Sequence, residues 1–187
     1  MANKKTLALT EEQYREIIDT MESGFLGSRP NHKIATALRL EANIGIRISD
    51  VLNLTLDDIV YECGRYRLDI TEQKTQKKRE FTVPLEVVEY IRRYCKENKI
   101  ADNEKIFDLS ERAVQKHLKL VCDYLGYEGI STHSFRKFFA TSIYKNNDYN
   151  IVLVQKLLQH SSPHTTQRYI GISTQEVEKA LSKHICL

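Results

Sequence analysis

Apolar residues recur with the helical period along most of this chain, and the pattern changes to alternation only within residues 59–84. One alternation runs through Tyr66, Leu68 and Ile70, and a second begins at Phe81. Alternation of this kind is typical of half-buried strands. The sequence therefore predicts a mainly α-helical fold with a small antiparallel β-sheet, an α+β class, in which two strands flank a polar, basic loop.

Capping residues and apolar faces delimit the helices. We expect helices over residues 11–21, 31–43, 85–94, 114–125, 133–145 and 151–158. Thr10 and Gln13 form a capping box before the first helix, and Ser49 is expected to cap a short helix. A second capping box, at residues 173–176, predicts a C-terminal helix within residues 171–187.

Length and composition favour one globular domain. The chain has 187 residues, of which 41% are hydrophobic and 28% charged, with only 7 Gly and 3 Pro. We predict a single catalytic domain over residues 1–187, which begins with a frayed lead at residues 1–8. The net charge of +3 permits a polyanionic partner without requiring one.

The cysteines and the N-terminus bear on the cellular compartment. The 4 cysteines form no Cys-x-x-Cys pair, a spacing that suits reduced thiols better than a zinc site or a disulfide framework. The sequence also has no signal-peptide pattern and no run of about 18 apolar residues that could span a membrane. We therefore expect a cytoplasmic protein.

Motifs of nucleotide- and metal-dependent enzymes are missing from the sequence. It has neither a Gly-rich phosphate loop nor a His-Glu-x-x-His motif. Asp50, Asp57 and Asp58 come nearest to a carboxylate cluster, but the last two read as a solvated turn. His164 follows His160 by four residues without a third ligand nearby, so we expect a surface histidine.

Cationic and imidazole side chains recur in an order that suggests chemistry on an anion. His133 and Arg136 are three residues apart at the start of a predicted helix, where they share a face near free backbone N–H groups. Arg47 follows a glycine earlier in the chain, and His160 precedes Tyr169 by nine positions across a polar turn.

Taken together, these blocks resemble the tyrosine recombinase, or phage integrase, family over residues 8–185. That family has an Arg after a Gly, a Lys in a β-hairpin, His-x-x-Arg, Leu-Leu-Gly-His-Ser and Thr-x-x-Tyr. The chain follows this order, with two departures. Gln159 stands in place of the usual Gly, and Lys137 stands where His is common.

The resemblance implies that DNA strands are cut and rejoined through a 3′-phosphotyrosyl link, with no metal, ATP or other cofactor. Tyr169 would be the nucleophile, and Arg47 and Arg136 would clamp the phosphate. His133 would act as the general base, and His160 would bind a phosphate oxygen.

Two further roles follow from the resemblance. Lys74 would protonate the 5′-oxygen, with Lys77 in the same loop as a rival. Asp50 would orient a His or an Arg of the site.

The resemblance also implies double-stranded DNA as the partner, bound by a homotetramer, with an accessory DNA-bending protein as an optional partner. The C-terminal helix would dock on a neighbouring protomer. A bacterial or phage-encoded protein is expected, either a naturally short recombinase or an excised catalytic domain. Three alternatives are a DNA-binding regulator that does not cleave, a type IB topoisomerase, and a metal-dependent phosphoesterase using His133, His160 and His164.

Overall fold

The computed structural model describes residues 6–171 and residue 182. The chain divides into two compact units, residues 1–139 and residues 140–187. The boundary between them falls inside helix α6 (Thr132–Asn146). Among the described residues, no helix has the length and apolar character needed to cross a membrane. The prediction of one catalytic domain stays a prediction.

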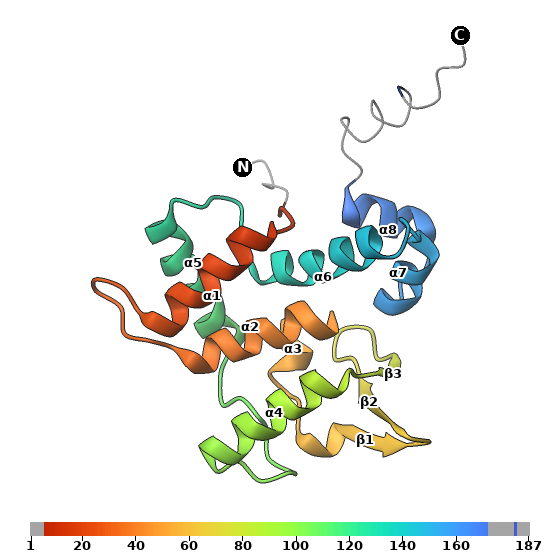
Figure 1. The fold of residues 1–187 in the computed structure, drawn as a ribbon, viewed down its shortest axis with the longest axis horizontal. Coiled ribbons are helices and arrows are strands. Elements are labelled where there is room, and N and C mark those ends of the chain that lie inside the picture. The colour runs from red at the N-terminus through yellow and green to blue at the C-terminus, as the bar shows by residue number, and fades with distance from the viewer. Residues whose placement is uncertain (1–5, 172–181, 183–187) are drawn as a thin grey trace. The chain divides into compact units, whose positions relative to one another are not determined.

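The first unit is mainly helical (Figure 1). Its helices are α1 (Glu11–Ser23), α2 (His32–Ile44), α3 (Ile48–Val51), the 3-10 turn η1 (Leu56–Asp58), α4 (Leu85–Asn98) and α5 (Glu111–Leu125). Helix α1 packs against both α2 and α5, and α2 packs against α3. The core that they share is apolar and fully buried, as Leu38 on α2 and Val88 on α4 illustrate.

Most of the predicted helix boundaries lie within a few residues of the observed ones. The capping box is confirmed, since the Gln13 N–H donates to the Thr10 hydroxyl at 3.1 Å and the Thr10 N–H donates to the Gln13 side chain at 3.0 Å. Helix α1 then continues to Ser23, two residues past the predicted end. Ahead of it, the Thr6 carbonyl accepts from Lys137 at 2.7 Å.

The prediction for Ser49 was wrong. Helix α3 begins at Ile48, so Ser49 lies inside the helix and Arg47 is the N-cap, without a side-chain capping bond. The short helix is held by its neighbours instead, because Ile48 and Val51 are buried in the core. The start of this helix is therefore set by the burial of its apolar residues and not by a capping side chain.

The sheet has three antiparallel strands in the order β1-β2-β3: β1 (Ile59–Glu62), β2 (Arg65–Thr71) and β3 (Lys78–Thr82). The register pairs Tyr61 with Tyr66 and Leu68 with Phe81. The two predicted strands are confirmed, but β1 was missed. Only Ile59 is buried among its four residues, so β1 has no alternation to detect.

The second unit contains the end of α6 followed by α7 (Ile151–Leu158) and α8 (Pro163–Ile170), which pack against each other. The polar turn predicted between His160 and Tyr169 is found at residues 159–162, but Pro163 does not belong to it, because Pro163 is the first residue of a helix that Ser162 caps. The predicted C-terminal capping box and helix lie outside the described residues.

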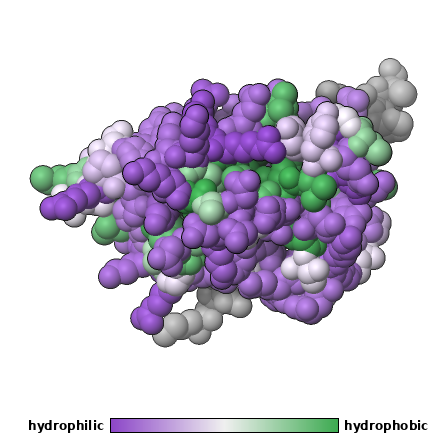
Figure 2. All heavy atoms as spheres, turned by 90° about the horizontal axis from the view of Figure 1, so that it is seen from below, coloured by the Kyte–Doolittle hydropathy of each residue, from purple (hydrophilic) through white to green (hydrophobic). Residues whose placement is uncertain are grey.

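Hydrophilic side chains predominate on the face of the molecule in Figure 2, with smaller apolar patches among them. Some large apolar residues of the described chain are well exposed, such as Leu26, Tyr61 and Val152. Single exposed apolar residues are common on protein surfaces and carry no functional argument by themselves.

Candidate active site

Arg47 is placed by a tight turn between α2 and α3. Gly45 ends α2 with a left-handed backbone at φ +65°, and a Cβ at this position would lie 2.2 Å from Cδ1 of Phe139. Only glycine fits both constraints. Ile46 is fully buried, so the turn is anchored and directs the Arg47 side chain, which is 20% exposed, toward the β2–β3 loop.

The loop between β2 and β3, residues 72–77, is closed by its own backbone. The Glu72 N–H donates to the Lys77 carbonyl at 3.0 Å, and the Gln76 N–H donates to the Glu72 carbonyl at 2.9 Å. Asp50 also holds the loop, because its carboxylate accepts the Gln73 N–H at 2.9 Å. This bond gives Asp50 a backbone partner in place of the His or Arg that the sequence predicted.

A buried ion-pair cluster lies at the base of this loop, and sequence reasoning missed it. Glu72 and Arg79 were both assigned to the polar, basic loop, but each is 1% exposed. Arg79 Nη1 donates to Glu72 Oε1 at 2.8 Å, and Arg47 Nη1 donates to Glu72 Oε2 at 2.5 Å. The carboxylate therefore joins two guanidinium groups.

The electrostatics of the cluster favour an ionised Glu72. Burial alone would raise the pKa of its carboxyl, but hydrogen bonds from Thr75, Arg47 and Arg79 lower that pKa to about 2. Burial and the charge of Arg136 lower the pKa of Arg79 to about 10. Both groups are thus charged near neutral pH.

His133 and Arg136 occupy the first turns of α6, as the sequence predicts. Arg136 is 2% exposed, whereas His133 keeps an exposed face. Partial burial lowers the pKa of His133, and nearby positive charges lower it further. These charges belong to Arg136, Arg47, Lys74 and Lys137. Four sequence-predicted residues thus lie close enough to interact within residues 1–139.

Within the second unit, His160 and Tyr169 lie close together. Helix α7 ends at Leu158, Gln159 adopts a left-handed backbone at φ 53°, and His160 follows. The His160 Nδ1 lies 3.0 Å from the hydroxyl of buried Thr166. The rings of His160 and Tyr169 meet edge to face, with centroids 5.2 Å apart. Tyr169 is half-buried on α8.

Sequence comparison decides the family. The model of the phage integrase family matches residues 8–176 of this chain. The chain belongs to the phage integrase family. Probable integrase/recombinase YoeC of Bacillus subtilis is 34% identical over 137 residues, which cover 70% of this chain and 72% of YoeC. Tyrosine recombinase XerA of Pyrococcus furiosus is 28% identical over 191 residues, covering 96% of this chain and 63% of XerA.

Solved structures of a site-specific recombinase and of an integrase share the fold. The XerH recombinase in its post-cleavage complex with palindromic difH superposes with a TM-score of 0.72 at 22% identity, covering 96% of this chain and 54% of XerH. The catalytic domain of bacteriophage HP1 integrase gives 0.67 at 18% identity, covering 96% of both chains. The predicted fold class is therefore confirmed, and the chain spans about half the length of XerH.

In the described part of this integrase-family chain, no three His, Cys, Asp or Glu side chains lie close enough together to hold a metal ion. His164 lies exposed in the first turn of α8.

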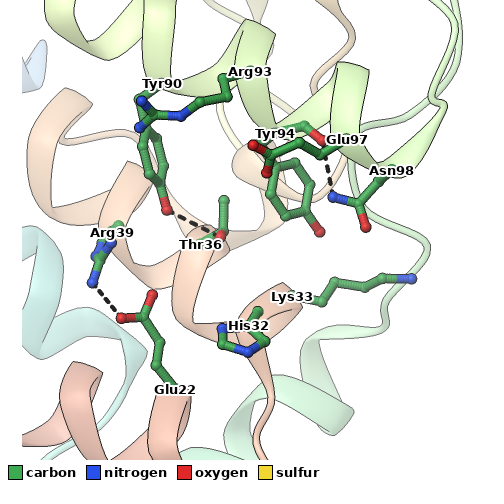
Figure 3. Close-up of a pocket in the computed structure, with 10 residues that line it drawn as sticks. All are labelled: Glu22, His32, Lys33, Thr36, Arg39, Tyr90, Arg93, Tyr94, Glu97 and Asn98. Carbon is green, nitrogen blue, oxygen red and sulfur yellow. Dashed lines mark hydrogen bonds and ion pairs between the residues drawn. The ribbon is translucent and has the colours of Figure 1, made fainter.

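A pocket of about 440 Å³ lies elsewhere in the first unit, beside α2 and α4 (Figure 3). Across it, the hydroxyls of Thr36 and Tyr90 are 3.1 Å apart, and Arg39 pairs with Glu22 at 2.7 Å. The pocket shares no residue with the predicted catalytic positions.

Proposed function

We propose that this chain performs site-specific DNA recombination by cutting and rejoining DNA strands through a covalent 3′-phosphotyrosyl intermediate at Tyr169. The observation that carries the proposal is the electrostatic cluster around His133. In a chain of the phage integrase family, Arg47, Lys74 and Arg136 all act on that imidazole. The complexes of XerH with difH, and of the Tn1549 integrase with circular-intermediate DNA, support DNA as the substrate.

The phosphate would be held by Arg47 and Arg136. Guanidinium groups match phosphate oxygens bidentately and stay charged, so they can stabilise the negative charge that grows in the transition state. Arg136 is almost fully buried and Arg47 is 20% exposed, which gives both charges low-dielectric surroundings. His160, oriented by Thr166, would donate a further hydrogen bond to a phosphate oxygen.

In the cleavage step, the Tyr169 oxygen forms a bond to phosphorus while the bond from phosphorus to the 5′-oxygen breaks. His133 takes the phenolic proton, and its lowered pKa keeps the imidazole neutral near pH 7 and able to accept it. Lys74 gives a proton to the departing 5′-oxygen. We favour Lys74 over Lys77 because the Lys74 charge acts on His133. Rejoining reverses these transfers.

The assembled form would be a homotetramer on two double-stranded DNA sites in the cytoplasm of a bacterium, where the chain serves a mobile element. The segment after Tyr169 would dock on a neighbouring protomer and so couple cleavage between subunits. An accessory DNA-bending protein would assist where the two sites must be brought together.

A nicked suicide substrate that carries the recombination site tests the proposal. Cleavage beside the nick releases a short oligonucleotide, which diffuses away and prevents rejoining. The wild-type protein should leave an adduct that resists SDS, with or without a chelator. Tyr169→Phe should bind the same DNA and leave no adduct. A wild-type protein that binds the site without forming an adduct would instead be a non-cleaving regulator.

A further inference from the structure

Glu72 connects the Arg47 guanidinium to the loop that bears Lys74. One carboxylate oxygen, Oε2, accepts from Arg47 Nη1 at 2.5 Å and from the Thr75 hydroxyl at 2.7 Å. The other oxygen, Oε1, accepts from Arg79 Nη1 at 2.8 Å. A single buried side chain therefore binds groups from the α2–α3 turn, the loop and strand β3.

The loop that holds Lys74 is defined by these contacts. Lys74 lies between Glu72 and Thr75, so the hydrogen bond from the Thr75 hydroxyl to the Glu72 carboxylate spans its backbone. The Gln76 N–H closes the turn on the Glu72 carbonyl at 2.9 Å. The Lys74 side chain itself is exposed, and it can reach outward from a base whose position is set.

Only an ionised carboxylate meets the demands of this position. Arg79 is 1% exposed and needs a nearby negative charge, because burial of an uncompensated cation is strongly unfavourable. An amide at position 72 would keep the shape, but it would lose the charge and turn an N–H₂ group toward a guanidinium or a hydroxyl. Glutamine is therefore a matched probe of charge at constant volume.

We propose that Glu72 is a positioning residue that sets Lys74, the general acid, relative to Arg47, the phosphate clamp. The inference rests on the proposed function. Through Thr75, the carboxylate fixes the loop that protonates the 5′-oxygen, and through Oε2 it also fixes the guanidinium that binds the phosphate. One carboxylate thus links the two functions, and within the loop the Thr75 hydroxyl is its direct contact.

The hydrogen bond from Thr75 can be removed while Glu72 keeps both of its ion-pair partners, Arg47 and Arg79. Thr75 is an exposed residue, and Thr75→Val removes its hydroxyl at nearly constant volume, whereas Thr75→Ser retains a hydroxyl. We expect Thr75→Val to slow cleavage by about tenfold or more, since general acid catalysis contributes roughly 10²–10⁴-fold. Thr75→Ser should cleave within about threefold of wild type, because it keeps a hydroxyl within reach of the carboxylate.

A substrate with sulfur in place of the 5′-oxygen shows which step is affected. A thiolate leaves without a proton, so a variant that has only lost the position of Lys74 should regain cleavage on this substrate. We expect Thr75→Val to come within about threefold of wild type on the sulfur substrate. Equal losses on both substrates, or no loss on either, would overturn the inference.

Glu80→Gln is the matched control for Glu72→Gln. Glu80 lies on the same hairpin, with a 38% exposed side chain, and pairs with Arg67 and Lys78 instead of the cluster. Glu72→Gln should slow cleavage of both substrates, because it disturbs Arg47 as well as the loop. Glu80→Gln should leave both rates unchanged.

Amide hydrogen exchange tests the same link without cleavage. The Gln76 amide should exchange at least about tenfold faster in Glu72→Gln and in Thr75→Val than in wild type, while the amides paired between β1 and β2 stay protected. Unchanged exchange at Gln76 in both variants would refute the positioning role. A wild-type protein without adducts would refute the proposed function instead, so the two failures are distinguishable.

Discussion

At the scale of single residues, His133 predicts how cleavage depends on pH. Its pKa is lowered by partial burial and by the charges of Arg136, Arg47 and Lys74. A general base works only when neutral, so its protonation at low pH stops catalysis.

The cleavage rate should therefore fall as the pH drops, with a midpoint below the ordinary histidine value of about 6.5. His133→Gln should be slow and should lose this acid limb. Single-turnover cleavage rates measured between about pH 5 and about pH 8 test whether His133 causes the acid limb. An acid limb of unchanged midpoint in His133→Gln would assign the titration to another group.

The residues of the site differ in how well sequence reveals them. Arg47, His133 and Arg136 stand in short motifs whose spacing can be read directly, and the structure brings these three together. Glu72 and Arg79 were missed because a charged residue in a polar run looks solvated. Their burial depends on the pairing of Glu72 with Arg47, 25 positions away, which local pattern does not encode.

At the scale of elements, the turn between α2 and α3 should be intolerant of substitution. Gly45→Ala would force a Cβ to 2.2 Å from the Phe139 ring in a left-handed backbone. We expect a loss of roughly 2–4 kcal/mol in unfolding free energy, from overpacking and strain together. Denaturant unfolding measures this loss.

Gly64→Ala is the control for that prediction. Gly64 has a similar φ of +77°, but no atom lies within 4 Å of its would-be Cβ. The unfolding free energy of Gly64→Ala should fall by only about 1 kcal/mol, because this variant has the backbone strain without the steric contact. Equal losses in the two variants would show that the contact with Phe139 is unimportant.

The end of helix α7 offers a gain in stability. Gln159 caps the helix in a left-handed conformation at φ 53°, where glycine is unstrained. Gln159→Gly should raise the unfolding free energy by up to about 1 kcal/mol. Gln159→Ala should not raise the unfolding free energy, because alanine keeps the backbone strain and also lacks the side-chain amide. Thermal melts compare the three proteins, and a Gly variant no more stable than Ala would contradict the prediction.

Elements with strong periodicity were predictable, and those held by tertiary contacts were not. Helix α5 follows its apolar face from Ser110 to Gly126 and lies close to the prediction. Strand β1 and the start of α8 lacked such a signal. In β1 only Ile59 is buried, and α8 begins at Pro163, which reads equally well as a turn.

At the scale of the whole molecule, the chain belongs to the phage integrase family, and each of its two units has a proposed role of its own. Residues 1–139 supply the cationic groups around His133, and residues 140–187 supply His160 and Tyr169. The chain spans about half the length of XerH, and the DNA contacts proposed for it are those of the region that the two share. Binding should come mostly from phosphate contacts and weaken steeply with salt.

Mapping the covalent link in the adduct tests the central claim most directly. The SDS-resistant complex is digested with protease and nuclease, and the nucleotide-bearing peptide is sequenced by mass spectrometry. We predict a single modified residue, Tyr169, joined to a 3′-phosphate. A link to any other residue, or to a 5′-phosphate, would contradict the account.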